Sequence, residues 1–484
     1  MPTRAAPPSH NPAPRLHRRQ FLSDAGSGLG GIALAWMLQA DGRAAPATDI
    51  GPAAHFPPRA KRAIHIFSPG GVSHVDTFDY KPDLEKHDGQ PLTGKGTLDP
   101  FFGKPGNLLR SLFAFRQRGE SGLWVSDLLP HLAQRADDLT FIHSMTTKSS
   151  SHTPACFQMN TGFTLNGFPS LGAWLSYGLG SENNQLPTFV VLPDPRGLPN
   201  GGSNNWSQGF LPAEHQGTAL ATDGDEPIAN LRTPEQVSID ERRAGLSLLN
   251  GLNQSFAADN PGDSGLAARV RSYELAAQMQ ASIPEAIDFA DETADTHRLY
   301  GLDDPVTAGF GRNCLLARRM LERGVRFVQL YNGASLGGNP RINWDAHEDV
   351  LDNHATQAAP LDRPCAGLLL DLKRRGLLDD TLVFWSSEFG RTPFTEGVGT
   401  LGRDHHNLAF TCWLAGAGLK PGTRYGATDE VGYQVAENPV TVYDFHATIL
   451  HLLGIDHTRL TFYHNGIQRR LTDVHGHVIH DLLA

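Results

Sequence analysis

Short apolar runs alternate with helical patterns along most of this chain of 484 residues, and no other sequence feature constrains its fold as strongly. The run from Ala63 to Phe67 ends at Ser68-Pro69-Gly70-Gly71, as a buried strand that leads into a functional loop would. Alternating strands and helices predict an α/β sandwich. The runs expected to form strands are residues 63–67, 139–143, 188–192, 325–331, 382–386 and 409–414.

Helical patterns lie between several of these runs. Residues 310–321 and 361–372 each repeat apolar side chains at intervals of three and four, and each pattern stops at a glycine, Gly324 or Gly376. Thr441 with Asp444 resembles a capping box at the start of a helix that reaches Leu453. The stretch 198–304 is read as an insertion or cap with helices at 241–256 and 266–280.

The amino terminus carries the features of an export signal. Arg18-Arg19-Gln20-Phe21-Leu22 matches a twin-arginine pattern, a short apolar stretch follows, and small residues near Ala47 offer a cleavage site. The apolar stretch is too short to span a bilayer comfortably. We therefore expect residues 1–47 to be a twin-arginine signal peptide and the mature protein to be periplasmic or extracellular, without a stable transmembrane anchor. A disordered tail with a chance arginine pair is the alternative.

Charge and cysteine content exclude several classes of protein. The net charge of −10 gives no electrostatic basis for binding nucleic acid or an anionic membrane. The four cysteines form no C-x-x-C pair, so neither a disulfide scaffold nor a structural zinc knuckle is expected. Cys314 and Cys365 fall on the apolar faces of the expected helices and should be buried thiols.

Polar residues suited to chemistry gather in four loops, each next to an expected strand. Because loops at the carboxyl ends of strands share one edge of an open α/β sheet, several of these groups should meet in a single cleft. The loops are Gly70 to Asp79 with His74 and Asp76, Ser149 to Pro154 with Ser151, His152 and Thr153, Asn343 to His347 with Asp345, and Ser387 to Arg391 paired with Arg403 to His406. In the second loop, Pro154 suits the first position of a helix capped by Thr153.

Imidazole and carboxylate groups together favour zinc, manganese or iron over calcium, which prefers oxygen ligands. Each residue taken alone also fits a structural role. The structural alternatives are turn caps for His74 and His354, an ion pair of Glu388 with Arg391, and a hydrogen bond between Asp404 and His406.

The order of these motifs resembles the alkaline phosphatase superfamily, in particular its sulfatase-like branch, and is most similar to the exported bacterial domain-of-unknown-function family 1501. The resemblance implies a three-layer sandwich with a central mixed sheet between helices over residues 48–484, and a metal-assisted hydrolase site. The segments that carry it are Gly70 to Pro82, His152 to Gly162, Trp344 to His347, Ser387 to Pro393, Arg403 to His406 and Tyr443 to Asp456.

The chain departs from the sulfatase pattern at the nucleophile. Sulfatases carry Cys or Ser followed by x-Pro-Ser-Arg, with Thr-Gly nine residues after the nucleophile, and counting back from Thr161 places His152 there. The cysteine that is converted to formylglycine is therefore absent. The late Ser-Asp-His-Gly metal motif reads Ser387-Glu388-Phe389-Gly390, so a carboxylate is kept and an imidazole is lost.

The position of each candidate residue in these loops suggests a role for it. Asp345, His347 and either His405 or His406 are expected to hold one divalent ion, zinc or manganese, with Glu388, His74 or Asp76 near a second. His152 is expected to attack the ester or to act as general acid or base. It would stand at a helix start that attracts anions, although a lone histidine there could simply hydrogen-bond to backbone. Ser151 and Thr153 are the alternative nucleophiles, and Arg391 or Arg403 would clamp the anion.

Two functions follow from these residues. The first is an exported metal-dependent hydrolase of phosphate or sulfate esters, whose anionic substrate could be a sulfated or phosphorylated glycan. The second is a catalytically degenerate relative that binds a glycan or a protein at the surface. The retained carboxylates and imidazoles favour catalysis, because burying so many polar groups costs free energy and an inert cleft would gain nothing from them.

Overall fold

The computed structural model describes residues 54–98, 100–102, 104–183, 185–222, 238–259, 279, 282–335, 341–397 and 399–484. The expected signal peptide lies outside these ranges, as does nearly all of the helix expected at 266–280. Gly51–Ala484 forms one compact unit. Among the described helices, none combines the length and the apolar character needed to cross a bilayer.

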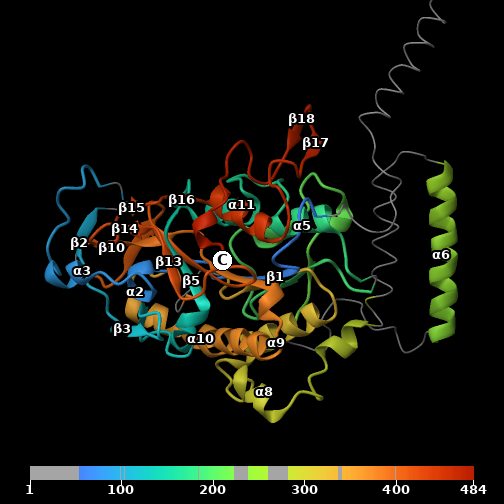
Figure 1. Cartoon of the computed structure of the whole chain (residues 1–484), viewed down its shortest axis with the longest axis horizontal. Helices are drawn as coiled ribbons and strands as arrows, with labels where there is room; N and C mark the ends of the chain where they lie inside the picture. The colour runs from blue at the N-terminus through green and yellow to red at the C-terminus, as the bar shows by residue number, and fades with distance from the viewer. Residues whose placement is uncertain are drawn as a thin grey trace, which may run out of the picture. The chain divides into compact units, whose positions relative to one another are not determined.

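A mixed sheet forms the middle layer of the described structure (Figure 1). Its strands are β1 (Arg62–Phe67), β5 (Leu139–Thr146), β6 (Phe189–Leu192), β7 (Thr218–Ala219), β8 (Phe327–Tyr331), β9 (Thr381–Ser386), β12 (Phe410–Gly416), β13 (Thr423–Tyr425) and β16 (Val440–Thr441). They run in the order β13-β5-β12-β9-β1-β8-β6-β7, with β16 also paired to β5. Strand β12 is antiparallel to β5 and β9, and the other pairs are parallel.

Helices cover both faces of this sheet (Figure 1). The covering helices are α4 (His152–Thr161), α5 (Leu171–Leu179), α9 (Ala308–Glu322), α10 (Val350–Arg374) and α11 (Val442–Leu452). Side chains alternate between the faces of a strand, so Ile64 and Ile66 of β1 pack in the core beneath α9 and α10. Ala63 and Phe67 of the same strand pack in the core beneath α5 and α11. The predicted three-layer α/β sandwich with a central mixed sheet is confirmed.

Most expected elements form, and one begins earlier than predicted. Cys314 of α9 and Cys365 of α10 are buried, and Thr441 and Asp444 make both hydrogen bonds of the capping box on α11. Helix α4 begins at His152, with Ser151 as the N-cap, instead of at Pro154. The amide groups of a first helical turn have no intrahelical acceptor, so a proline fits the third position as well as the first.

The described chain also contains smaller elements. One is a three-stranded sheet of β2 (Pro105–Leu108), β10 (Gly390–Glu396) and β11 (Arg403–His406). Three strand pairs are β3 (Phe115–Arg118) with β4 (Leu123–Ser126), β14 (Ala427–Thr428) with β15 (Val435–Glu437), and β17 (Phe462–His464) with β18 (Ile467–Arg469). The smaller or separate helices are α2 (His74–Thr77), α3 (Pro82–Lys86), α6 (Ile239–Asp259) and α8 (Ala294–Leu299). Helix α6 corresponds to the helix expected at 241–256. Within the expected insertion at 198–304, β7 extends the central sheet beside β6.

Candidate metal centre

The loops that the sequence singled out meet at one edge of the central sheet. Strands β1, β8 and β9 are parallel, and β5 points the same way because both β5 and β9 are antiparallel to β12. Their carboxyl ends therefore lie together, and the loops that follow them carry His152, Asp345 and Glu388. Strand β11 reaches the same place and adds His405.

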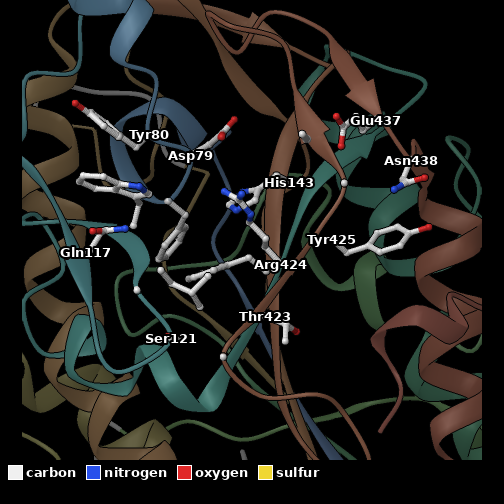
Figure 2. Close-up of a pocket in the computed structure, with 18 of the residues that line it drawn as sticks. Asp79, Tyr80, Gln117, Ser121, His143, Thr423, Arg424, Tyr425, Glu437 and Asn438 are labelled. Atoms are coloured by element: carbon white, nitrogen blue, oxygen red, sulfur yellow. The ribbon is translucent and has the colours of Figure 1, made fainter.

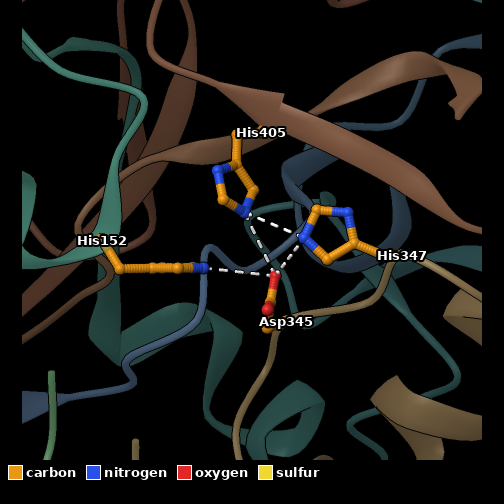
Figure 3. Close-up of side chains that lie close together, drawn as sticks. All are labelled: His152, Asp345, His347 and His405. Carbon is orange, nitrogen blue, oxygen red and sulfur yellow. Dashed lines mark hydrogen bonds and ion pairs between the residues drawn. The ribbon is translucent and has the colours of Figure 1, made fainter. Parts of the chain in front are cut away.

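Four side chains converge there: His152, Asp345, His347 and His405 (Figure 3). Each offers one ligand atom, and these atoms lie within 4.8 Å of one another. The Nε2 atoms of the three histidines face Oδ1 of Asp345, at 3.2 Å for His152, 2.7 Å for His347 and 3.2 Å for His405. The Nε2 atoms of His347 and His405 are 3.0 Å apart. We call these four residues the histidine cluster.

The other ring nitrogen of each histidine has its own partner in the protein. Nδ1 of His152 lies 2.6 Å from Oε1 of Glu388, and Nδ1 of His405 lies 2.6 Å from the backbone carbonyl of Ser150. Nδ1 of His347 contacts a carboxylate oxygen of Glu396. A carbonyl or an ionised carboxylate can only accept, so each Nδ1 carries the proton and donates it.

Consequently, all three Nε2 atoms present lone pairs to one another and to a carboxylate oxygen. Four acceptors at such short range repel one another unless a positive centre lies among them. Nε2 of His152 has no hydrogen-bond partner in the described structure, although it is buried. Nitrogen and oxygen atoms bound to a tetrahedral zinc at about 2.1 Å lie roughly 3.4 Å apart, somewhat more than the separations of 2.7 to 3.2 Å in the cluster. Three imidazoles held by acceptors at Nδ1, together with one carboxylate, thus fit a divalent transition metal.

Asp345 is held at the centre of the histidine cluster by two arginines. Arg391 donates from Nη2 to Oδ1 at 2.5 Å, and Arg341 contacts Oδ2. Burial alone would raise the pKa of this carboxyl, but the positive charge of Arg391 and the contacts with the three histidines hold the pKa well below its ordinary value. Asp345 is therefore an anion at any physiological pH.

The pKa values of two of the histidines are shifted in opposite directions. Burial lowers the pKa of His405 to about 3 despite its contact with Asp345, so this imidazole is neutral at pH 7. Burial also opposes protonation of His152, but its contacts with Asp345 and Glu388 outweigh it and raise the pKa. Without a bound cation, a proton on His152 would be the positive charge between these two carboxylates.

Other residues predicted for the site lie outside the histidine cluster. Glu388 lies behind His152 and also accepts a hydrogen bond from the backbone amide of Gly70 at 2.8 Å. His406 and His74 point Nε2 at backbone carbonyls, those of Tyr433 at 2.5 Å and Gly432 at 2.8 Å. Asp76 is paired with Arg403 at 2.7 Å.

The two arginines expected to clamp an anion are fully buried. Besides Asp345, Arg391 donates to the backbone carbonyls of Gly70, Gly71 and Arg403. Arg403 donates to Asp76 and to the backbone carbonyls of Leu109, Arg110 and Thr392. Both arginines connect the loops of the site. The alternative nucleophiles Ser151 and Thr153 are half-buried at the start of α4.

Gly70 allows two of the site loops to approach each other. Its φ is +118°, and a Cβ atom there would lie 2.4 Å from the backbone nitrogen of Trp344 and 2.6 Å from that of Asp345. Only glycine fits both the dihedral angle and this approach. Phe389 packs its ring 5.0 Å from that of His152 and 4.7 Å from that of His405.

The sequence interpretation missed two groups that orient the histidines, Glu396 and the carbonyl of Ser150. Metal-binding histidines usually donate their second nitrogen to such acceptors, so partners were to be expected in general. The identity of Glu396 depends on how β10 and β11 pair, and the register shifts between Arg391 and Thr395. A β-bulge of this kind has no clear sequence marker.

A separate cavity of about 820 Å³ lies beside β5, β13 and the β3–β4 pair (Figure 2). Its lining includes Tyr80, Trp124, His143, Arg424 and Glu437, and it shares no residue with the histidine cluster. Basic and acidic side chains are mixed along its walls, so their charges favour no particular ligand.

Comparison with known proteins gives a family match and distant structural likenesses. Residues 60–483 match the model of a family described as "Protein of unknown function (DUF1501)". No curated protein matches the sequence. Similar solved structures include the PsFucS1 sulfatase from Pseudoalteromonas sp., at 13% identity over 88% of this chain and 72% of that chain, with a TM-score of 0.35.

Two further solved structures show the same level of likeness. A mutant TAB5 alkaline phosphatase with Mg bound is 11% identical over 82% of this chain and 98% of that chain, with a TM-score of 0.36. A protein in the alkaline phosphatase superfamily from Vibrio parahaemolyticus is 11% identical over 85% of this chain and 71% of that chain, with a TM-score of 0.34.

Proposed function

This chain belongs to the DUF1501 family, and we propose that it is a hydrolase of phosphate or sulfate esters that depends on a divalent metal ion. The observation that carries the proposal is the convergence of three Nε2 atoms and one carboxylate oxygen in the histidine cluster. Zinc or manganese suits this mixture of imidazole and carboxylate groups. A bound ion would polarise the ester and lower the pKa of an attacking water.

In this proposal the residues around the cluster keep the imidazoles ready to bind the ion. Glu388, Glu396 and the carbonyl of Ser150 hold the protons on Nδ1 and thereby leave each Nε2 unprotonated. His152 contributes its Nε2 to the cluster in place of attacking the ester. Arg341, about one-third exposed and in contact with Asp345, is the cation we assign to the anionic group of the substrate.

We also propose that the protein is exported in folded form by the twin-arginine machinery and acts in the periplasm or outside the cell. The support is the order of Arg18-Arg19, an apolar stretch and a small-residue cleavage site within residues 1–47. Replacing both arginines by lysine should leave the precursor in the cytoplasm. Normal export of that double variant would contradict the proposal.

Metal analysis combined with an ester screen tests the proposed activity. The purified protein should contain stoichiometric zinc or manganese and should hydrolyse at least one ester in a panel of phosphate, phosphonate and sulfate esters. The variant His405→Gln should lose both metal and activity. His406→Gln is the matched control, because the neighbouring His406 points at the carbonyl of Tyr433 and not into the cluster.

The outcomes of this experiment separate the alternatives. Equal metal loss in both variants would mean that the cluster is not the binding site. Stoichiometric metal without turnover of any ester, combined with binding of a sulfated or phosphorylated glycan, would identify the protein as a binding member of the family.

A further inference from the structure

Two adjacent phenylalanines, Phe101 and Phe102, stand exposed beside the histidine cluster. The two residues are 43% and 45% exposed, and their rings meet edge to face with centroids 4.6 Å apart. Phe101 stacks on His405 at 4.9 Å, and Phe102 meets the ring of His347 at 5.2 Å. Both rings therefore touch candidate metal ligands on one side and solvent on the other.

Hydrogen bonds fix these rings relative to the cluster. The backbone amide of Phe102 donates to Oδ2 of Asp404 at 2.8 Å, and the amide of His405 donates to Oδ1 of the same carboxylate at 2.7 Å. One buried carboxylate thus connects the backbone of the phenylalanine pair to that of a candidate ligand. Strand β11, which carries His405, thus also holds the backbone of Phe102 through Asp404.

The phenylalanine pair is an exposed apolar surface next to a cluster that solvent can reach. The side chains of His152 and His347 are 13% and 10% exposed, so solvent reaches the cluster. Buried Phe389 packs against His152 and His405, whereas the pair leaves much of its apolar surface open. Covering that surface with the ring of a ligand would remove apolar area from water and allow stacking on the phenylalanine faces.

We propose that Phe101 and Phe102 form a specificity subsite for a ring with an apolar face, carried by the alcohol part of the ester. The inference rests on the proposed function, because it needs an anionic ester group at the cluster. Small alkyl esters lack a ring to cover the pair and bind less tightly. The ring could be a flat aromatic ring or a saturated ring like that of a sugar, and both present an apolar face.

Binding of phosphonates to the metal-loaded full chain tests the subsite without requiring turnover. Isothermal titration calorimetry compares methylphosphonate with phenylphosphonate and cyclohexylphosphonate, which separate flat from saturated rings. The unsubstituted protein should bind at least one ring compound about ten times more tightly than methylphosphonate, because the ring buries apolar area on the phenylalanine pair. The variant Phe101→Ala/Phe102→Ala should bind all three compounds about equally. Tyr463→Ala, which removes an exposed aromatic ring from β17, should keep the preference.

A second variant controls for the possibility that the alanine substitutions disturb the local structure. Phe101→Leu/Phe102→Leu keeps apolar bulk without a flat face, and it should retain metal while losing most of the preference for phenylphosphonate. A preference that survives in the double alanine variant, or equal binding of all three compounds to the unsubstituted protein, would overturn the subsite and leave the anion site intact. Binding of none of them would overturn the proposed ester site, and the subsite with it.

Discussion

At the level of single residues, the proposed metal binding depends on the proton on Nδ1 of His347. Glu396 accepts this proton and so leaves Nε2 free to bind an ion. Glu396→Gln removes the negative charge, and we expect metal affinity to fall by about tenfold to a hundredfold, as for other residues that orient metal ligands. Competition with a chelator measures the change.

Glu348 supplies the control for that variant. It follows His347 in the sequence, pairs with Arg341, and has a side chain that is 72% exposed. Glu348→Gln should therefore change metal affinity little, because exposed ion pairs contribute little. If both variants bind metal as the unsubstituted protein does, the hydrogen bond from His347 has no role in holding the ion.

At the scale of elements, the loop after β1 depends on a glycine. Gly70→Ala would force a Cβ atom to within 2.4 Å of backbone at Trp344 and would require a left-handed dihedral angle from alanine. Gly89 has φ +75° but open space around it, so Gly89→Ala carries only the dihedral cost, about 1–2 kcal/mol. We expect Gly70→Ala to lower the free energy of unfolding by more than this and to abolish metal binding. Equal effects in urea unfolding would show that the two loops do not touch.

Helix α11 offers a test of its amino-terminal cap. Oγ1 of Thr441 accepts a hydrogen bond from the amide of Asp444, whose carboxylate accepts one from the amide of Thr441. Thr441→Ala should lower the free energy of unfolding by about 1 kcal/mol, whereas Thr441→Ser, which keeps the hydroxyl, should cost much less. Thermal denaturation distinguishes the two variants. If the alanine variant is as stable as the serine variant, the hydroxyl of Thr441 does not stabilise the start of α11.

The same elements show what the sequence could specify. Local sequence signals were enough to predict α11, because a capping box and a terminal glycine each involve only a few neighbouring residues. They misplaced the start of α4, because a proline is tolerated throughout the first turn. They could not find Glu396, because its contact with His347 depends on a bulge in the pairing of two strands.

At the scale of the whole molecule, strand order decides which loops meet. The alternation of strands and helices predicted the sandwich and a shared edge, and the four loops do come together there. The sequence left His405 and His406 open as alternatives. Successive side chains of β11 point to opposite faces, so only His405 faces the cluster. That choice required the position of β11 beside β10, which no local pattern specifies.

Stability should fall on the acid side because several histidines are buried as neutral imidazoles. Burial lowers the pKa of His446 to about 4, and that of His143 to about 4, from 6.5. Between pH 6.5 and 4 the unfolded chain takes up these protons and the folded chain does not. Each group should therefore lower the free energy of unfolding by about 1.4 kcal/mol for each pH unit between pH 6.5 and pH 4. Above pH 6.5 it should have no such effect.

The variant His446→Gln isolates one of these contributions. Nε2 of His446 donates to the carbonyl of Met159 at 2.9 Å, and the glutamine amide can replace that donor without titrating. Thermal melts from pH 5 to pH 7 should show a shallower loss of Tm in the variant than in the unsubstituted protein. Parallel curves would mean that His446 accepts a proton in the folded state.

Anomalous diffraction would show directly whether the histidine cluster holds a divalent metal ion. Crystals of the protein as purified would be measured above and below the absorption edges of zinc and manganese. We predict one strong anomalous peak within coordination distance of Nε2 of His152, His347 and His405 and of Oδ1 of Asp345. Absence of a peak there in crystals grown with both metals, or a peak only at another place, would contradict the account.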